Sequence, residues 1–461
     1  MRVLALDIGS SSTRAALFDG SAARTTPIAS RTYDLRYSDD GAAELDPVLL
    51  RRAVRAVYAK FKSRRADVIA SCAFWHGLLG LDKNLRPLTP IYTWGDSRAR
   101  ADAAQLRNQF REDDVLQRTG CVLRFAFWPA KLRWLRRTNP RLFKRVVFWV
   151  SPSDWLLHSL FGELFTSPSM ASATGLFNER TRTWNSEMCE AAYISGEQLP
   201  PIRDSRDSDG RLLSTIGDGA ASNFGSGAVK DDCAAISLGT SAAVRVMTRR
   251  MLRVPAGLFR FVAGRDTFVL GGATSNCGNL HAWCTRELQT LPKAKLLRDE
   301  AAGDQLVALP FFVAERAPDW PEIAGAISGL SLGTTRTQIS RALMVSALYR
   351  VADIFDDIET AVGRVKRIIV SGGMTKLSGL VQVLADVLAR DIEVAADTEA
   401  SLRGAAVHAF ALTGELPRIA RPGRRVYFDK GLSKMHRQRR EEQREFEERL
   451  QDSASMRSKR G

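Results

Sequence analysis

The stretch MRVLALDIGSSSTRAALFDG, residues 1–20, sets a short polar turn between two apolar runs. The first run ends at Asp7 and the second follows Arg14. Between them stand Gly9 and hydroxyl side chains at positions 10–13. Apolar runs on either side of a glycine-containing turn predict a β-hairpin. The backbone N–H groups and hydroxyls at its tip are donors of the kind that form anion-binding sites.

A similar stretch, DDCAAISLGTSAAVRVMT, occurs at residues 231–248. It also runs from apolar residues through a glycine and a hydroxyl-rich turn into a second apolar run that contains a basic residue. The two stretches lie about half a chain apart, which suggests two halves of related architecture. Either turn alone is more often only a hairpin. The pair, together with an apolar run that ends in Ser371-Gly372-Gly373, favours a nucleotide-binding cleft.

The length and composition limit the class of protein. A chain of 461 residues is too long for one hydrophobic core and favours two domains of about 200 residues. No apolar stretch reaches the roughly 18 residues of a membrane span, and the first apolar run is too short for a signal peptide, so we expect a cytoplasmic protein with no membrane partner. The six cysteines are scattered and no HExxH-like ligand pair occurs. We therefore expect buried thiols and no structural zinc.

The net charge of +16 raises the question of a nucleic-acid partner. The arginines, however, are mixed with apolar residues in helix-like stretches such as 51–65 and 132–145. No RNA-binding aromatic signature, zinc finger or basic zipper accompanies them. We therefore expect no nucleic-acid partner, and a salt-sensitive gel shift would be needed to revive that class.

Periodicity predicts the remaining secondary structure. Apolar residues recur at helical spacing in several stretches, and two short apolar runs are typical of buried strands. The strands are expected at 67–75 and 366–373, and the helices at 46–62, 97–110, 337–362, 377–390 and 401–414. Residues 416–461 form a basic, mixed-charge tail, whose opposite charges four residues apart suit a solvated helix. We expect this helix to fray toward its end, with a partner-binding role as the alternative.

Two familiar phosphate-binding signatures are missing. No stretch fits the P-loop pattern GxxxxGK[ST], and no HRD motif with a downstream DFG occurs. The hairpin turns offer another arrangement, in which amides and hydroxyls hold phosphate while a nearby carboxylate holds a hydrated metal ion. Asp7 supplies such a carboxylate.

Seven segments, in order along the chain, resemble the FGGY carbohydrate kinases of the actin/sugar kinase/Hsp70 superfamily. The resemblance runs from residue 1 to about 415. The segments are DIGSSSTR, FWHGLLGLDKNLRPLTPIYTWGDSRA (74–99), PSMASATGLFNERTRTW (168–184), SLGTSAAVR, LPFFVAERAPDW (309–320), VSGGMTKLSGLVQVLADVLARDIEV and EASLRGAAVHA. Within the family, FWHGLLGLD, RTGCVLRFAFWPAKLRWL and SMASATGL are most similar to gluconate kinases, with xylulose kinases next.

The resemblance implies an α/β fold of two ribonuclease-H-like domains around a central cleft. Residues 1–228 would form the N-terminal domain, which binds the sugar and carries the catalytic base. Residues 229–415 would form the nucleotide-binding C-terminal domain, followed by the tail at 416–461. A homodimer stays open as an assembly state.

The same resemblance assigns residues to the site. It places the catalytic base on Asp218, which also contacts the substrate, in the small-residue turn STIGDGAASNFGSGA (214–228). From the residues alone, a turn aspartate with only a local hydrogen bond is the alternative. Trp75 and His76 are expected to line the sugar pocket. ATP and Mg²⁺ are the implied cofactors, and Asp7 would hold the metal through water. The expected ATP-binding residues are Asp7, Gly9, Ser10, Ser11, Ser12, Arg14, Gly239, Thr240, Ser241, Gly372, Gly373 and Ser378.

The expected reaction is ATP-dependent phosphorylation of a terminal hydroxyl, most of all D-gluconate to 6-phosphogluconate. A xylulokinase, or another ketose or polyol kinase, is the alternative. A substrate with a carboxylate needs a positively charged side chain to bind it, and Arg124 and Lys131 are the candidates. Structural and substrate-binding roles are weighed equally for the W-x-D-x-R residues Trp94, Asp96 and Arg98.

Two departures from the family pattern motivate a different class, a catalytically weak sugar- or nucleotide-binding sensor or scaffold. The stretch before Asp218 is short, and the family's GER is AER at 314–316.

Overall fold

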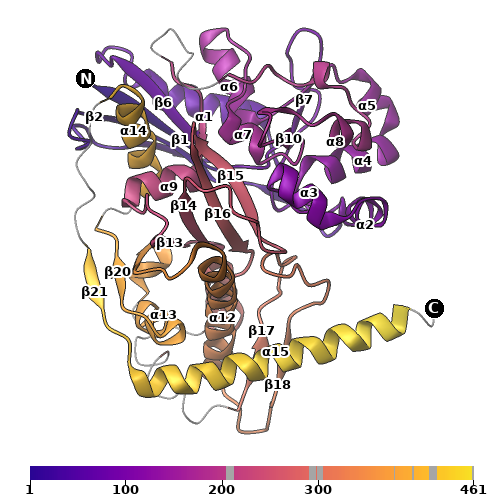
Figure 1. The fold of residues 1–461 in the computed structure, drawn as a ribbon, viewed down its shortest axis with the longest axis vertical. Helices are drawn as coiled ribbons and strands as arrows, with labels where there is room; N and C mark the ends of the chain where they lie inside the picture. The colour runs from indigo at the N-terminus through magenta and orange to yellow at the C-terminus, as the bar shows by residue number, and fades with distance from the viewer. Residues whose placement is uncertain are drawn as a thin grey trace.

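The computed structural model describes residues 1–203, 212–289, 297, 305–377, 379–396, 399–414 and 423–458. Two mixed sheets with helices around them make up most of the molecule (Figure 1). The predicted α/β architecture is confirmed. Each sheet is built around one of the two hairpins that the sequence predicts.

The first sheet has the strand order β12-β6-β1-β2-β3. β1 and β2 form the first hairpin, β3 continues it in antiparallel fashion, and β6 and β12 run parallel to β1. Asp7 pairs with Arg14 across the hairpin and with Cys72 on β6. The strands are β1 (Val3–Ile8), β2 (Ser12–Phe18), β3 (Ala29–Thr32), β6 (Val68–Ala73) and β12 (Ile216–Gly217).

The second sheet has the order β15-β16-β14-β13-β19-β20-β21. Its middle strands, β16-β14-β13-β19-β20, repeat the order and directions of β3-β2-β1-β6-β12. The prediction of two related halves is therefore confirmed. The strands are β13 (Cys233–Leu238), β14 (Ala242–Thr248), β15 (Phe259–Gly264), β16 (Thr267–Thr274), β19 (Arg367–Ser371), β20 (Ile392–Val394) and β21 (Arg424–Val426).

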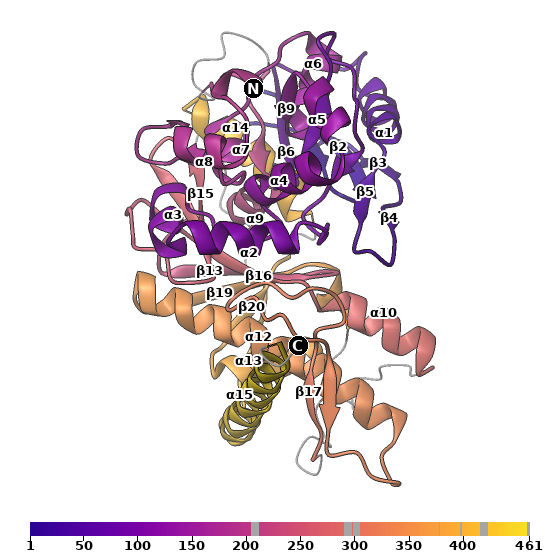
Figure 2. The ribbon, with the colours of Figure 1, turned by 90° about the vertical axis from the view of Figure 1, so that its right-hand side faces the viewer.

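Helices flank both sheets (Figure 2). Those before the second sheet are α1 (Pro47–Ala59), α2 (Arg100–Gln109), α3 (Glu112–Thr119), α4 (Trp128–Thr138), α5 (Pro140–Arg145), α6 (Pro152–Phe161), α7 (Pro168–Ser172), α8 (Ser186–Ala191) and α9 (Asp218–Ser226). The later ones are α10 (Gly278–Glu287), α12 (Arg336–Val362), α13 (Leu380–Leu388), α14 (Ala400–Leu412) and α15 (Lys430–Ser458). Most predicted helices are thus confirmed, but the one expected from 377 begins at Leu380, after the 3₁₀ turn η3 (Gly373–Lys376).

Short strands and one further 3₁₀ turn complete the described chain. They are β4 (Arg36–Tyr37), β5 (Ala43–Leu45), β7 (Leu79–Leu81), β8 (Ile91–Tyr92), β9 (Phe148–Val150), β10 (Phe177–Asn178), β11 (Thr183–Trp184), η1 (Gly196–Gln198), β17 (Val307–Leu309) and β18 (Ala326–Ser328).

α14 lies beside the first sheet, although its neighbours in sequence belong to the second (Figure 1). It packs on α9 at very short range, because glycines stand where the backbones meet. A Cβ atom added to Gly404 would lie 1.7 Å from the carbonyl oxygen of Ala221, and one added to Gly225 would lie 1.8 Å from that of Ala400. The small residues of both helices therefore serve close helix packing.

The tail differs from its expected solvated state. α15 lies along α12, α13 and β17 and buries Ser433, His436, Gln443 and Glu447. The hydroxyl of Tyr349 lies 2.9 Å from His436 Nδ1, and burial lowers the pKa of His436 to about 4. The helix itself was predicted correctly, but the expectation of a solvated helix was wrong, because side chains of α15 at intervals of three or four residues contact α12.

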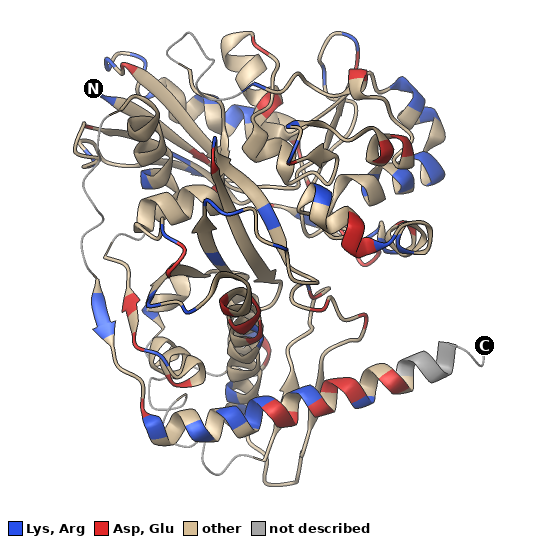
Figure 3. Cartoon of the chain, in the orientation of Figure 1, with Lys and Arg blue, Asp and Glu red and all other residues tan. Residues whose placement is uncertain are grey.

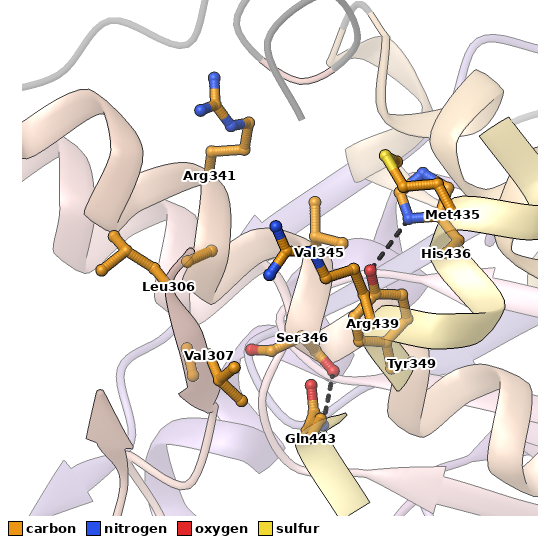
Figure 4. Close-up of a pocket in the computed structure, with 12 residues that line it drawn as sticks. Leu306, Val307, Arg341, Val345, Ser346, Tyr349, Met435, His436, Arg439 and Gln443 are labelled. Carbon is orange, nitrogen blue, oxygen red and sulfur yellow. Dashed lines mark hydrogen bonds between the residues drawn. The ribbon is translucent and has the colours of Figure 1, made fainter. Parts of the chain in front are cut away.

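α15, α12 and β17 also line a pocket (Figure 4). Val345 and Tyr349 of α12 and Met435 of α15 line it, among others. None of the site residues predicted from the sequence lines this pocket.

Charged and cysteine side chains follow the sequence expectations in part. The six cysteines are free and buried, as predicted. Lysine and arginine are dispersed over many elements, with acidic residues between them on α15 (Figure 3).

Within the described residues, no helix is long and apolar enough to cross a membrane.

Candidate active site

Asp218 is the first residue of α9, directly after β12. The expected small-residue turn is thus a helix start, where the backbone amide of Gly219 donates to Asp218 Oδ1 at 2.7 Å. Burial raises the pKa of Asp218 to about 6, opposed by the positive charge of Arg245 and reinforced by the negative charge of Asp7. A carboxylate with a pKa in this range is ionised near neutral pH yet basic enough to accept a proton.

The first hairpin holds Asp7 in a satisfied environment. Ser401 Oγ donates to Asp7 Oδ2 at 3.1 Å, and Cys72 Sγ lies 3.4 Å from Oδ1. Arg14 Nη1 lies 3.9 Å from Asp7 and 2.6 Å from Glu399, so Arg14 joins the hairpin to the start of α14. Burial raises the pKa of Asp7, while Arg14 lowers it.

The tip of the first hairpin is closed by main-chain bonds. The Gly9 amide donates to the Ser12 carbonyl at 2.9 Å, and the Tyr33 hydroxyl donates to the Gly9 carbonyl at 2.6 Å. The side chains of Ser10, Ser11 and Ser12 are partly or fully exposed there. Their hydroxyls therefore stand at the surface of the tip, where a phosphate ligand could reach them.

The second hairpin is backed by the start of α10. The amides of Gly278 and Asn279 donate to the carbonyls of Gly239 and Thr240 at 2.9 and 3.1 Å, while Thr240 itself is exposed and Ser241 partly so. Gly278 must be glycine for this contact, because an added Cβ would lie 2.5 Å from the Gly239 oxygen.

Gly372 and Gly373 lie beside the second hairpin but differ in surroundings. Gly372 has φ +103°, and an added Cβ would lie 2.2 Å from the Leu238 carbonyl oxygen. Gly373 has nothing within 4 Å of that position, so open space is available there for a ligand. Ser378 lies outside the described residues.

Trp75 and His76 follow β6 and reach the neighbourhood of Asp218. The Trp75 ring fills space that a Cβ on Gly217 or Gly219 would occupy, at 1.8 and 2.3 Å, and its Nε1 donates to the Ser169 carbonyl at 3.1 Å. His76 Nδ1 lies 2.7 Å from the Ala173 carbonyl. Nδ1 therefore carries the hydrogen, and burial lowers the pKa of the ring to about 3. A neutral imidazole with Nε2 as acceptor is suited to a sugar hydroxyl.

The W-x-D-x-R residues divide between two roles. Arg98 donates to Asp96 Oδ1 at 3.1 Å and to Glu44, and its guanidinium lies 4.4 Å from the centre of the Trp134 ring, so Asp96 and Arg98 stabilise their loop. Trp94 instead contacts Arg316, whose guanidinium lies 4.5 Å from the ring centre.

The two residues predicted to bind a substrate carboxylate, Lys131 and Arg124, have other partners in the structure. Lys131 is 1% exposed, and its ammonium donates to the carbonyls of His76, Thr93 and Tyr92 at 2.9, 2.7 and 3.4 Å. All three hydrogens are used, so the prediction for Lys131 was wrong. Arg124 pairs with Glu112 at 2.8 Å and lines a separate pocket of about 300 Å³.

Sequence reasoning missed four residues that the second sheet and its loops bring to Asp218, Trp75 and His76. Arg245 comes from β14, Arg316 from the AER segment, and Phe259 and Phe261 from β15. The Phe261 ring contacts Trp75 and His76 with centroids at 4.9 and 5.5 Å, and it stacks on Phe259 at 4.2 Å. The sequence did contain one signal, an arginine within an apolar run. Burying a charged side chain in a strand costs free energy, so such an arginine indicates a partner or a ligand.

The departures from the family pattern can be located in part. In the AER segment, buried Glu315 accepts from Asn276 Nδ2 at 3.0 Å and from the Ser275 amide, so the loop is well organised. Most of the shortened stretch before Asp218, residues 204–211, lies outside the described residues.

The first hairpin fits a hydrated magnesium ion better than a directly bound one. Among the described residues, no group of three or more acidic, histidine or cysteine side chains could hold a metal ion. Mg²⁺ commonly keeps several waters and takes one or two carboxylates together with substrate phosphates. Asp7 supplies one carboxylate beside the hydroxyls of the hairpin tip, which suits contact through water.

The comparisons with known proteins agree with this geometry. The N-terminal domain of the FGGY family of carbohydrate kinases matches residues 2–225, and the C-terminal domain of that family matches residues 234–412. The chain belongs to the FGGY family of carbohydrate kinases. It is therefore a kinase enzyme.

Relatives of this kinase differ in the substrate that their names give. Gluconokinase of Bacillus subtilis (strain 168) is 26% identical over 454 residues, covering 90% of this chain and 88% of the relative. Glycerol kinase of Thermococcus kodakarensis is 27% identical over 453 residues, covering 90% of each.

Solved structures share the fold. A ligand-bound xylulose kinase from Lactobacillus acidophilus superimposes with a TM-score of 0.87 at 22% identity, covering 97% of this chain and 98% of the other. A gluconate kinase from the same organism gives 0.86 at 22% identity and the same coverage. These likenesses establish the architecture of this kinase.

Proposed function

We propose that this kinase transfers the γ-phosphoryl group of ATP to the terminal hydroxyl of a sugar acid, D-gluconate above all. The observation that carries the proposal is the position of Asp218. It is a half-buried carboxylate at a helix start, within electrostatic reach of Asp7 on the first hairpin and of Arg245 on the second. Phosphoryl transfer requires such a proton acceptor between the acceptor alcohol and the phosphate-binding groups.

In this proposal Asp218 accepts the proton of the sugar hydroxyl as that oxygen bonds to the γ-phosphorus and ADP leaves. Amides and hydroxyls at the two hairpin tips bind the phosphates, and Gly373 leaves room for the nucleotide. Mg²⁺ would neutralise phosphate charge, with Asp7 as its water-mediated ligand. His76 and Trp75 orient the sugar hydroxyls and the carbon chain.

The choice of gluconate rests on similarity together with charge. The 74–82 segment resembles gluconate kinases, and the Bacillus gluconokinases are among the relatives. Two arginines beside Asp218 also suit an anionic substrate better than a neutral one. Xylulose and glycerol are the competing substrates that other relatives' names suggest.

An ADP-release assay with a panel of sugar acids, ketoses and polyols tests the proposal. We expect turnover of gluconate that falls as pH drops below about 6, because Asp218 must be unprotonated to act as base. Asp218→Asn should lower kcat by about 10²- to 10⁴-fold while ATP binding is retained. The matched change Asp266→Asn, in an exposed turn, should have no effect.

Turnover of xylulose with none of gluconate would overturn the substrate. A fully active Asp218→Asn variant would remove Asp218 from the mechanism. Binding of ATP without turnover of any sugar on the panel would favour the sensor alternative.

A further inference from the structure

Arg245 is placed on the sugar side of the second hairpin. The last paired residues before the tip are Leu238 and Ala242, whereas Arg245 pairs with Ala235, three residues deeper into β14. A Cβ added to Gly271 would meet Arg245 Cγ at 3.0 Å and the Phe259 ring at 2.9 Å. The stem of Arg245 therefore lies beside the aromatic cluster that contacts Trp75 and His76.

The head group of Arg245 points toward the catalytic aspartate. A Cβ added to Gly219, the residue after Asp218, would lie 2.7 Å from Arg245 Nε. The guanidinium of Arg245 donates to the neutral Ser237 Oγ at 3.1 Å. Within the described residues it forms no ion pair, so most of its donors are available to a ligand.

Arg316 brings a second guanidinium to the same place. It donates to the Thr274 carbonyl at 2.8 Å and to Ser275 Oγ at 3.1 Å, and it stacks on Trp94. These contacts fix its orientation without neutralising it. Burial lowers the pKa of Arg316 to about 10, opposed by the negative charge of Glu315 and reinforced by the positive charge of Arg245.

Two guanidinium groups thus act on one catalytic carboxylate beside the sugar-binding aromatic residues, and Glu315, the other acid that acts on Arg316, accepts hydrogen bonds from Asn276 and the Ser275 amide. Like charges held together and partly withdrawn from water are stabilised by an anionic ligand. The nucleotide phosphates have their own donors at the hairpin tips. A carboxylate carried by the substrate itself is the anion that fits this place.

We propose that Arg245, supported by Arg316, binds the carboxylate of the sugar acid and so makes the kinase select sugar acids over neutral polyols. This inference rests on the proposed function and adds the residues that determine specificity. An arginine binds a carboxylate with two parallel hydrogen bonds, which a neutral CH₂OH group at the same carbon does not provide. Sequence reasoning had sought this role at Arg124 and Lys131.

Steady-state kinetics of wild type, Arg245→Gln and Arg316→Gln test the proposal, with D-gluconate and the neutral hexitol D-glucitol as acceptors. Arg245→Gln should raise the KM for gluconate on the order of 10²-fold, since a desolvated charge pair loses one partner. Arg316→Gln should give a rise of about tenfold. The KM for ATP and the use of glucitol should change by less than about threefold. Arg245→Lys should recover part of the gluconate affinity, because it restores the charge without the fork geometry.

Arg249→Gln is the matched control, because Arg249 is exposed just after β14. It removes one positive charge four residues along the chain from Arg245 and should leave every constant unchanged. Thermal unfolding of each variant separates loss of recognition from loss of fold, and Arg316→Gln carries the test if Arg245→Gln does not fold.

The outcomes separate this inference from the proposed function. If wild type turns over gluconate but the KM of Arg245→Gln is unchanged, or the KM for ATP rises in parallel, this inference alone is wrong. If wild type phosphorylates only neutral sugars, the sugar-acid function and this inference both fail.

Discussion

The two hairpins are built alike but carry different charges. Two residues before the turn glycine, the first hairpin has Asp7 and the second has Ser237. Arg14 on the first strand pair faces Asp7 and Glu399, whereas Arg245 on the second donates to Ser237. Arg14 thus forms ion pairs with two acids, whereas Arg245 forms none within the described residues and is acted on by the charge of Asp218.

The helices that pack against the two hairpins also differ in the charged groups that they supply. The start of α14 covers the first and supplies Ser401 and Glu399, both of which engage its charged groups. The start of α10 backs the second with backbone amides of Gly278 and Asn279. The difference teaches that the two halves share one architecture but differ in charge, with a carboxylate before the turn of the first hairpin and, before the turn of the second, a neutral hydroxyl that accepts from an arginine.

The largest expected effect comes from a substitution that disrupts the packing of α14, the helix that covers the first hairpin. Gly404→Val introduces a side chain whose Cβ would lie 1.7 Å from the Ala221 carbonyl oxygen of α9. We expect a loss of about 3 kcal/mol of stability, since backbone and helix must both shift. Urea unfolding measures it. Gly196→Ala, with nothing within 4 Å, is the control, and an unchanged midpoint in Gly404→Val would show that α9 and α14 do not pack this closely.

The next prediction makes the first hairpin neutral like the second. Asp7→Asn keeps the shape but removes the carboxylate, so we expect a loss of about 10- to 100-fold in kcat/KM and a higher magnesium requirement. A magnesium titration of activity measures both. Asp34→Asn, at an exposed site, should behave as wild type, and an unshifted titration for Asp7→Asn would refute the role of Asp7.

The converse change gives the second hairpin an acid. Ser237→Asp places a carboxylate where Ser237 Oγ lies 3.1 Å from Arg245, and the new ion pair should compete with the substrate. We expect the KM for gluconate to rise about tenfold, which corresponds to about 1.4 kcal/mol. Ser237→Asn is the control without charge. Equal effects of the two changes would mean that charge at this position does not matter.

The smallest expected effect is the stability that the folded protein loses when Asp218 ionises. The pKa of Asp218 is about 6 in the folded chain and 3.8 when unperturbed. Between these values the folded state holds more protons, so stability falls as pH rises from about 4 to 6. Asp218→Asn should therefore be equal to wild type near pH 3 and more stable at pH 7.5 by about 1 kcal/mol, because solvent screening at the partly exposed carboxylate reduces the roughly 3 kcal/mol that the two pKa values alone would give. Thermal unfolding at both pH values checks this, and a destabilised variant at pH 7.5 would contradict it.

Local patterns explain what could be predicted. The hairpins, the long helix α12 and the helix of the tail each follow from residues within one short window. Asp218 came from resemblance to a family, and its raised pKa depends on burial that the sequence does not record. Lys131 failed as a prediction because a lysine in a helix gives no sign that three carbonyls from distant turns surround its ammonium group.

The sequence by itself determined two glycine-centred hairpins half a chain apart, and with them the duplicated fold and the family. Only the tertiary structure decided which charges meet. Asp7 and Ser401 are 394 residues apart, and Trp75 meets Phe261 across the two sheets. Strand and turn propensities depend on residues close together in the sequence. The position of α14 and the partners of Arg245 depend on how the sheets and helices pack.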